Sequence, residues 1–181
     1  MRCAHSLLVR HSRPTLTLMK VMWLIAGLLT NTAIAEPRTH CDSSEKTVFS
    51  CTILGSKKVA SLCGDAGRFN EVTSLQYRFG ASGRPEMVYP KVKQGSLEKF
   101  FAHFETHQEG SITDLWFMVG SYRYLLAADS ARGRKVSSHI VVYKDWIPVA
   151  NLECAKTLVD EVRGLGGTIP DANESGFFKQ K

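Results

Sequence analysis

The 181-residue chain has little of what marks several large protein classes. It contains only 6 prolines, and its apolar residues never form the run of about 20 that a membrane helix needs. This composition excludes disordered, collagen-like and multi-spanning membrane proteins. The chain also lacks a Gly-x-Ser-x-Gly elbow, a His-Glu-x-x-His motif, a phosphate loop and a dinucleotide-binding glycine pattern. We therefore assign no catalytic residues, no metal and no cofactor, and we expect a protein that is not an enzyme.

The first 35 residues resemble a secretory leader. A Met-Lys start at residues 19–20 precedes an apolar run at 21–29, and the small residues at 33–35 stand directly before Glu36. This order predicts cleavage after Ala35, with Met19 as the true start of translation. The apolar run is too short to span a bilayer, so we expect no stable membrane insertion after cleavage. Export would place the protein in the periplasm or outside the cell.

The net charge also depends on this leader. Residues 1–35 hold four basic residues and no acidic ones, so their removal lowers the formal charge from +6 to +2. The largest basic cluster that remains is at residues 132–135, which we interpret as a solvated turn. We expect no nucleic-acid partner.

Four cysteines remain after the leader, namely Cys41, Cys51, Cys63 and Cys154. An even number in an exported chain predicts two disulfides, and the spacings lack the paired Cys-x-x-Cys clips of zinc sites. Gly55-Ser56 fits a tight turn between strand-like runs at residues 47–54 and 57–63. The resulting register places Cys51 and Cys63 on opposite faces, so the preferred pairs are Cys51–Cys154 and Cys41–Cys63.

Further strand-like runs follow at short intervals. Residues 74–80 and 86–89, 114–119 and 122–128, and 136–143 and 146–152 form pairs around short turns, the last around Lys144-Asp145. We predict an all-β fold, a small antiparallel meander barrel or sandwich, as a single domain over residues 36–167. Residues 97–107 fit both helix and strand, and we favour strand. Helical spacing after Cys154 predicts a short C-terminal helix, followed by a flexible tail at residues 168–181.

The spacing of His103, Glu105 and His107 is the one metal-like pattern. On a strand, four residues span about 13 Å, too far for the two histidines to share an ion, so we favour exposed polar residues. An alternative function is a small envelope hydrolase that uses acids such as Asp114 and Glu105 with His103. A structural envelope factor without a ligand is a third possibility.

Aromatic residues interleaved with cations point to a binding surface. Tyr, Trp and Arg anchor protein interfaces, although Tyr and Trp also line β-sheet cores. Turns between strands are the best exposed places for such residues. The candidate binding residues lie at two hairpin tips: Ser121, Tyr122, Arg123, Tyr124 and Lys144.

The chain resembles a group of small exported periplasmic proteins of Gram-negative bacteria. The likeness lies in Lys-Lys-Val-Ala-Ser-Leu-Cys-Gly, Leu-Gln-Tyr-Arg-Phe-Gly, Pro-Glu-Met-Val-Tyr-Pro and Val-Ala-Asn-Leu-Glu-Cys, and it covers most of residues 41–154. In overall plan the chain is also similar to periplasmic lysozyme inhibitors. Those inhibitors use a Ser-Gly-x-x-Tyr loop and a lysine, and the nearest string here, Gly120 to Tyr124, has Gly and Ser in reverse order.

Together these features predict a periplasmic, non-enzymatic binding protein. Its partner is expected to be another protein or a cell-envelope component, recognised through the hairpin tips. An inhibitor or immunity-type protein against a cell-wall-degrading enzyme is the most specific form of this expectation.

Overall fold

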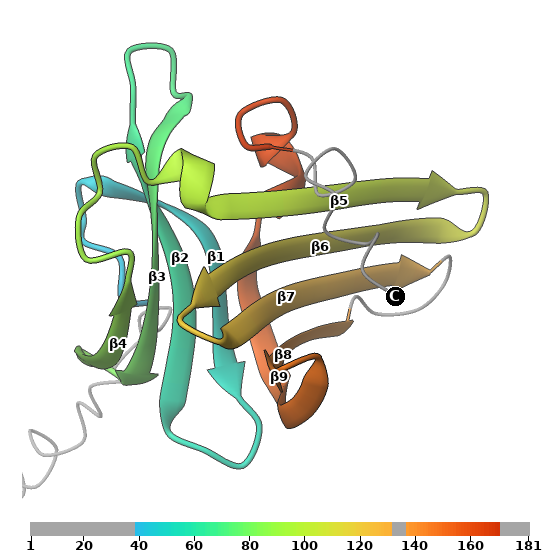
Figure 1. Ribbon diagram of the computed structural model, residues 1–181. Coiled ribbons are helices and arrows are strands. Elements are labelled where there is room, and N and C mark those ends of the chain that lie inside the picture. The colour runs from blue at the N-terminus through green and yellow to red at the C-terminus, as the bar shows by residue number, and fades with distance from the viewer. Residues whose placement is uncertain (1–38, 132–136, 171–181) are drawn as a thin grey trace, which may run out of the picture. The chain divides into compact units, whose positions relative to one another are not determined.

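The computed structural model describes residues 39–131 and 137–170, and these form an all-β domain, which confirms the predicted fold class. Nine strands form one antiparallel sheet. Figure 1 shows that this sheet is curled. The expectations for the leader and the basic cluster concern residues outside this part of the chain. The strands are β1 (Glu45–Ile53), β2 (Lys58–Ala66), β3 (Val72–Ala81), β4 (Arg84–Tyr89), β5 (Phe100–His107), β6 (Gly110–Val119), β7 (Tyr122–Ala131), β8 (Ser137–Lys144) and β9 (Ile147–Asp160).

The sheet is two meanders joined through β9. The strand order is β4-β3-β2-β1-β9-β8-β7-β6-β5, so most neighbours in space are also neighbours in sequence. Strand β9 pairs with β8 as far as Glu153, and with β1 from Cys154 onwards. Figure 1 shows β5, β6 and β7 crossing β1 and β2 at a steep angle, so the sheet curls into a half-barrel.

The curled sheet encloses one main hydrophobic core. Buried side chains from both meanders belong to it, together with residues that follow β9. The outer strands β4 and β5 are not hydrogen-bonded to each other, but their aromatic rings meet. Tyr89 of β4 stacks on Phe117 at 5.1 Å between ring centroids and lies 6.2 Å from Phe100 of β5. Aromatic packing therefore takes the place of strand pairing where the barrel is open.

The structure confirms the first hairpin and both disulfides. Phe49 pairs with Leu62 and Cys51 with Ala60, as the Gly55-Ser56 turn predicts. The disulfides are Cys41–Cys63 and Cys51–Cys154. A bulge between Thr47 and Phe49 breaks the alternation of β1, so Val48 and its neighbour Phe49 both pack in the main core.

Residues 97–107 confirm the predicted strand, because a single 3-10 turn (Leu97–Lys99) leads directly into β5. The expected C-terminal helix is wrong. Strand β9 continues to Asp160 alongside β1, and only a 3-10 turn (Val162–Leu165) follows. Hydrogen bonding to β1 makes this segment a strand, although its apolar residues have helical spacing. No helix in the described residues is long and apolar enough to cross a membrane.

Two boundaries also differ from expectation. The last hairpin turns at Asp145-Trp146, one residue later than predicted, because Lys144 pairs with Ile147. Beyond the expected domain end at residue 167, Ile169 is buried in the main core, and the Pro170 carbonyl accepts a hydrogen bond from the Ala102 amide. The packed chain therefore extends to Pro170, and residues 171–181 lie outside the described part.

A buried charge network holds the segment before β1 against the second face of the sheet. The Glu45 carboxylate is 1% exposed and accepts hydrogen bonds from both terminal nitrogens of Arg78, at 2.7 and 2.8 Å. It also pairs with Lys93 and accepts the Asp42 amide hydrogen. Burial alone would raise the pKa of Glu45, but these donors outweigh it and hold the pKa below its ordinary value.

We predict that the two disulfides contribute unequally to stability. Cys51–Cys154 joins residues 103 apart and Cys41–Cys63 residues 22 apart. From loop-closure entropy we expect Cys51–Cys154 to add about 5 kcal/mol and Cys41–Cys63 about 3 kcal/mol to the free energy of unfolding. Replacing Cys51 and Cys154 by Ala should therefore lower the urea midpoint more than replacing Cys41 and Cys63. Equal midpoints for the two double variants would contradict this order.

We predict that the Glu45 network makes stability sensitive to acid. Because the pKa of Glu45 is lower in the folded than in the unfolded state, its stabilisation is complete above the ordinary value of 4.5. It is lost as pH falls through the lower, folded-state pKa. Glu45→Gln should cost about 3 kcal/mol at pH 7, because it leaves the Arg78 charge buried. Unfolding free energies of both proteins between pH 7 and pH 3 should converge at the acid end.

Candidate functional site

The strongest candidate is a surface where two hairpin turns lie side by side. Tyr122 pairs with Lys144 across β7 and β8, and Lys144 pairs with Ile147 across β8 and β9. These pairs bring the β6–β7 and β8–β9 turns to the same end of the sheet. We define the tip surface as Tyr122, Lys144, Trp146, Ile147 and Val149.

The tip surface is unusually apolar for exposed residues. Trp146 is 51% exposed, Ile147 66% and Val149 54%, while Tyr122 is 38% exposed. The Lys144 ammonium lies 5.8 Å from the Tyr122 ring centroid. Aromatic and aliphatic side chains bordered by a cation form the composition that protein interfaces favour.

Trp146 has a strained backbone. Its φ angle is +69° and that of Asp145 is +48°, so both turn residues are in the left-handed region. Two-residue hairpin turns of this kind prefer Asn-Gly or Asp-Gly, and a bulky residue there costs energy. The chain nevertheless has a tryptophan at this position, so an indole lies at the tip in spite of the energetic cost.

The guanidinium of Arg123 stacks on the inner side of this indole. Its guanidinium carbon lies 3.3 Å from the Trp146 ring centroid and 5.3 Å from that of Trp116. Arg123 is buried, and burial lowers the pKa of its guanidinium while Tyr143 acts in the opposite direction. An arginine remains charged in proteins, so the site contains a cation between two aromatic rings.

Only some of the five binding residues predicted from the sequence are exposed at the hairpin tips. Ser121, Tyr122 and Lys144 are exposed at the tips, as expected, whereas Arg123 lies beneath Trp146. Tyr124 points the other way and stacks on Phe117 in the main core, with centroids 4.9 Å apart and planes 3° apart. The sequence prediction also missed Trp146, Ile147 and Val149, because it treated residues 146–152 as an ordinary strand. Asp145 was the available sequence signal, because aspartate is common at the first position of two-residue hairpin turns.

A second group of polar residues lies on the outer face of β5 and β6. His103 is paired with Asp114, and the Glu105 carboxylate stands between His103 and His107. Burial raises the pKa of Asp114 and Asp129 raises it further, while His103 and His139 lower it. The structure therefore brings the predicted alternative set, His103, Glu105 and Asp114, onto one face.

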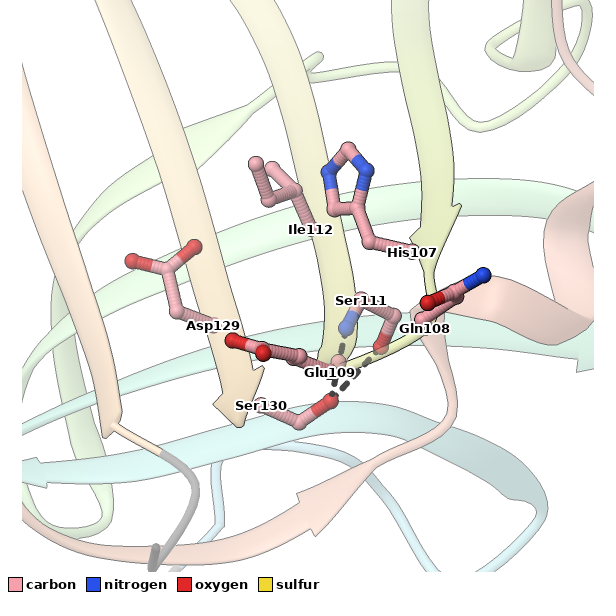
Figure 2. A pocket seen from close by; sticks show the side chains of 8 residues that line it. His107, Gln108, Glu109, Ser111, Ile112, Asp129 and Ser130 are labelled. Atoms are coloured by element: carbon pink, nitrogen blue, oxygen red, sulfur yellow. Dashed lines mark hydrogen bonds between the residues drawn. The ribbon is translucent and has the colours of Figure 1, made fainter. Parts of the chain in front are cut away.

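Two pockets border this outer face. One, of about 460 Å³, lies at the β5–β6 turn and is lined by His107, Gln108, Glu109, Gly110, Ser111, Ile112, Asp129 and Ser130. In Figure 2 the imidazole of His107 stands beside Ile112, and the hydroxyls of Ser111 and Ser130 are hydrogen-bonded at 2.7 Å. The other pocket, of about 270 Å³, lies between β8 and β9 beside His139 and Glu153. Neither is lined by a residue of the tip surface.

The tightest group of ligand-type side chains does not form a metal centre. Within residues 39–131 and 137–170, Cys41, Glu45 and Cys63 alone form a trio with ligand atoms within 4.8 Å. Both sulfurs belong to the Cys41–Cys63 disulfide, and the carboxylate belongs to the network with Arg78. A thiolate is required for metal binding, so this trio is structural.

Comparisons of this chain with models of protein families, with curated proteins and with solved structures find no match.

Proposed function

We propose that the protein is an exported, non-enzymatic binding protein that recognises another protein or a cell-envelope component through its tip surface. The observation that carries the proposal is that Tyr122, Trp146, Ile147 and Val149 are all exposed at the same end of the sheet, in or next to the β6–β7 and β8–β9 turns. Large exposed apolar patches on soluble proteins mark binding sites. The partner should present apolar side chains at the centre of its contact surface.

The strain at Trp146 supports the same proposal. An indole at positive φ has a backbone cost that a glycine would avoid, and its stacking on Arg123 offsets only part of that cost. Arg123 beneath the ring restricts the rotamers of the indole, so little side-chain entropy is lost when a partner covers it. A preorganised aromatic anchor of this kind is typical of an interface centre.

Export to the periplasm is part of the proposal. The two disulfides are consistent with an oxidising compartment, because reducing compartments rarely retain them. The leader pattern before Glu36 points the same way. In that compartment, a cell-wall-degrading enzyme is the partner we favour, which would make the protein an inhibitor or an immunity-type protein.

The first experiment is affinity capture with purified wall-degrading enzymes, including lysozymes, as baits. A stoichiometric one-to-one complex that lowers the enzyme's activity would support the inhibitor form of the proposal. If no bait binds while the protein itself releases wall fragments, and Asp114→Asn abolishes that turnover, the protein is a hydrolase and the proposal is wrong.

We predict that variants of the tip surface separate binding from folding. Trp146→Gly removes the indole but also relieves the positive φ, so the unfolding free energy should change by no more than about 1 kcal/mol. Binding to the captured enzyme should weaken at least about tenfold, the loss expected for an interface anchor. Lys144→Ala should weaken it less. Titration calorimetry gives the affinities and urea unfolding gives the stabilities.

The matched control is Phe69→Ser. Phe69 is 88% exposed in the β2–β3 turn and lies outside the tip surface, so its loss removes a similar exposed aromatic ring. Its affinity should equal that of the unchanged protein. A Trp146→Gly protein that binds as tightly as the control would remove the tip surface from consideration.

A further inference from the structure

The outer face of β5 carries an alternating row of His103, Glu105 and His107. Successive side chains of a strand point to opposite faces, so these three share one face, while Phe104 between the first two packs against the main core. Oε2 of Glu105 lies 3.8 Å from Nε2 of His103, and Oε1 lies 3.7 Å from Nε2 of His107. One carboxylate therefore faces two imidazoles, one with each of its oxygens.

These separations suit metal coordination. Zinc bonds to nitrogen and oxygen are about 2.0–2.2 Å long, so two ligands at a tetrahedral angle lie about 3.4 Å apart. The observed gaps are slightly longer, and a small side-chain rotation closes them. The two histidines are too far apart to share one ion, as their spacing on a strand requires, but each can share an ion with Glu105.

The geometry points to a carboxylate-bridged pair of divalent metal sites on the outer face of β5, in which His103 binds one ion, His107 binds a second and Glu105 bridges them. Imidazole and carboxylate together select ions such as Zn²⁺ and Cu²⁺ over Mg²⁺ and Ca²⁺, which prefer oxygen ligands alone. Water completes the coordination of each ion.

The surroundings support cation binding. Asp114 is directly opposite His103 on β6, within reach of an ion held there. Glu109 and Asp129 line the same pocket as His107 and add negative charge at that end of the row. Glu105 and His107 are each about half exposed, so ions can enter without any change in the fold.

The test is calorimetric titration of the purified protein with Zn²⁺ and, separately, Cu²⁺ at pH 7.5. We expect saturation near two ions per chain, with Cu²⁺ bound more tightly than Zn²⁺. His107→Asn should lower the stoichiometry to one. Glu105→Gln, which keeps the shape of the side chain, should weaken both sites at least about tenfold. His139→Asn is the matched control, because His139 lies on the same face but across Ala127 from Asp114, away from Glu105.

Two results would overturn the assignment. One is the absence of saturable binding of either ion to the unchanged protein. The other is equal affinity in the Glu105→Gln and His139→Asn proteins, which would show scattered histidine binding without a bridge. Circular dichroism of every variant separates loss of ligands from loss of fold. Neither result depends on the tip surface, so this assignment and the proposed function can fail separately.

Discussion

The rest of the structure depends on the point at which β9 changes partner. Glu153 is its last residue paired with β8, and Cys154 is its first paired with β1. The Cys51–Cys154 disulfide connects β1 and β9 at this point. Backbone pairing with β1 begins at the same residue, so the disulfide and the β1–β9 ladder together determine where β9 bends. The disulfide restricts the bend, and the restricted bend lets Tyr77 of one meander pack on Phe117 of the other at 4.9 Å.

Because the sheet is curled, its concave and outer faces differ in which side chains they bury. The concave face is filled by the main core, so it holds few groups that could meet a partner. The outer face of β5–β8 carries a smaller cluster around Trp116, Leu125 and Val141, with Arg123 at one end and Asp114 towards the other. Both proposed sites accordingly lie on the outer face or at the turns.

The sequence predicted those parts of the fold in which local rules and tertiary contacts agree. Gly55-Ser56 determined the first hairpin, and the correct register then excluded a Cys51–Cys63 bond. The sequence prediction was wrong where pairing with a distant strand determines the local structure. The helical spacing after Cys154 was overridden by pairing with β1, which is more than a hundred residues away and leaves no trace in the local pattern. The turn at Asp145-Trp146 was misplaced because few sequences put tryptophan in the left-handed region.

The candidate sites were predictable to the same extent. Hairpin tips can be read from turn residues, so the exposed positions of Ser121, Tyr122 and Lys144 were predicted correctly. A one-residue error in the last turn moved Trp146 into a strand, and the alternation of β7 turns Tyr124 into the core although its neighbours face outward. The strand spacing correctly separated His103 from His107, but the role of Glu105 depends on rotamers, which no sequence pattern specifies.

The two proposed sites lie on different strands, towards opposite ends of β6, which runs between them. Strand β6 runs ten residues from Gly110, which pairs with His107, to Val119, which pairs with Tyr122, a distance of about 30 Å. His103 is nearer to the tips, because its partner Asp114 lies four residues, about 13 Å, along β6 from Met118, which pairs with Arg123. Both separations exceed the Debye length of about 8 Å at physiological salt, so screening weakens the action of bound ions on the exposed Lys144 cation. A partner at the tips could therefore bind whether or not ions occupy β5. Any coupling between the sites would have to pass through the paired backbones of β6 and β7, which the main core and the smaller outer cluster hold rigid on both faces.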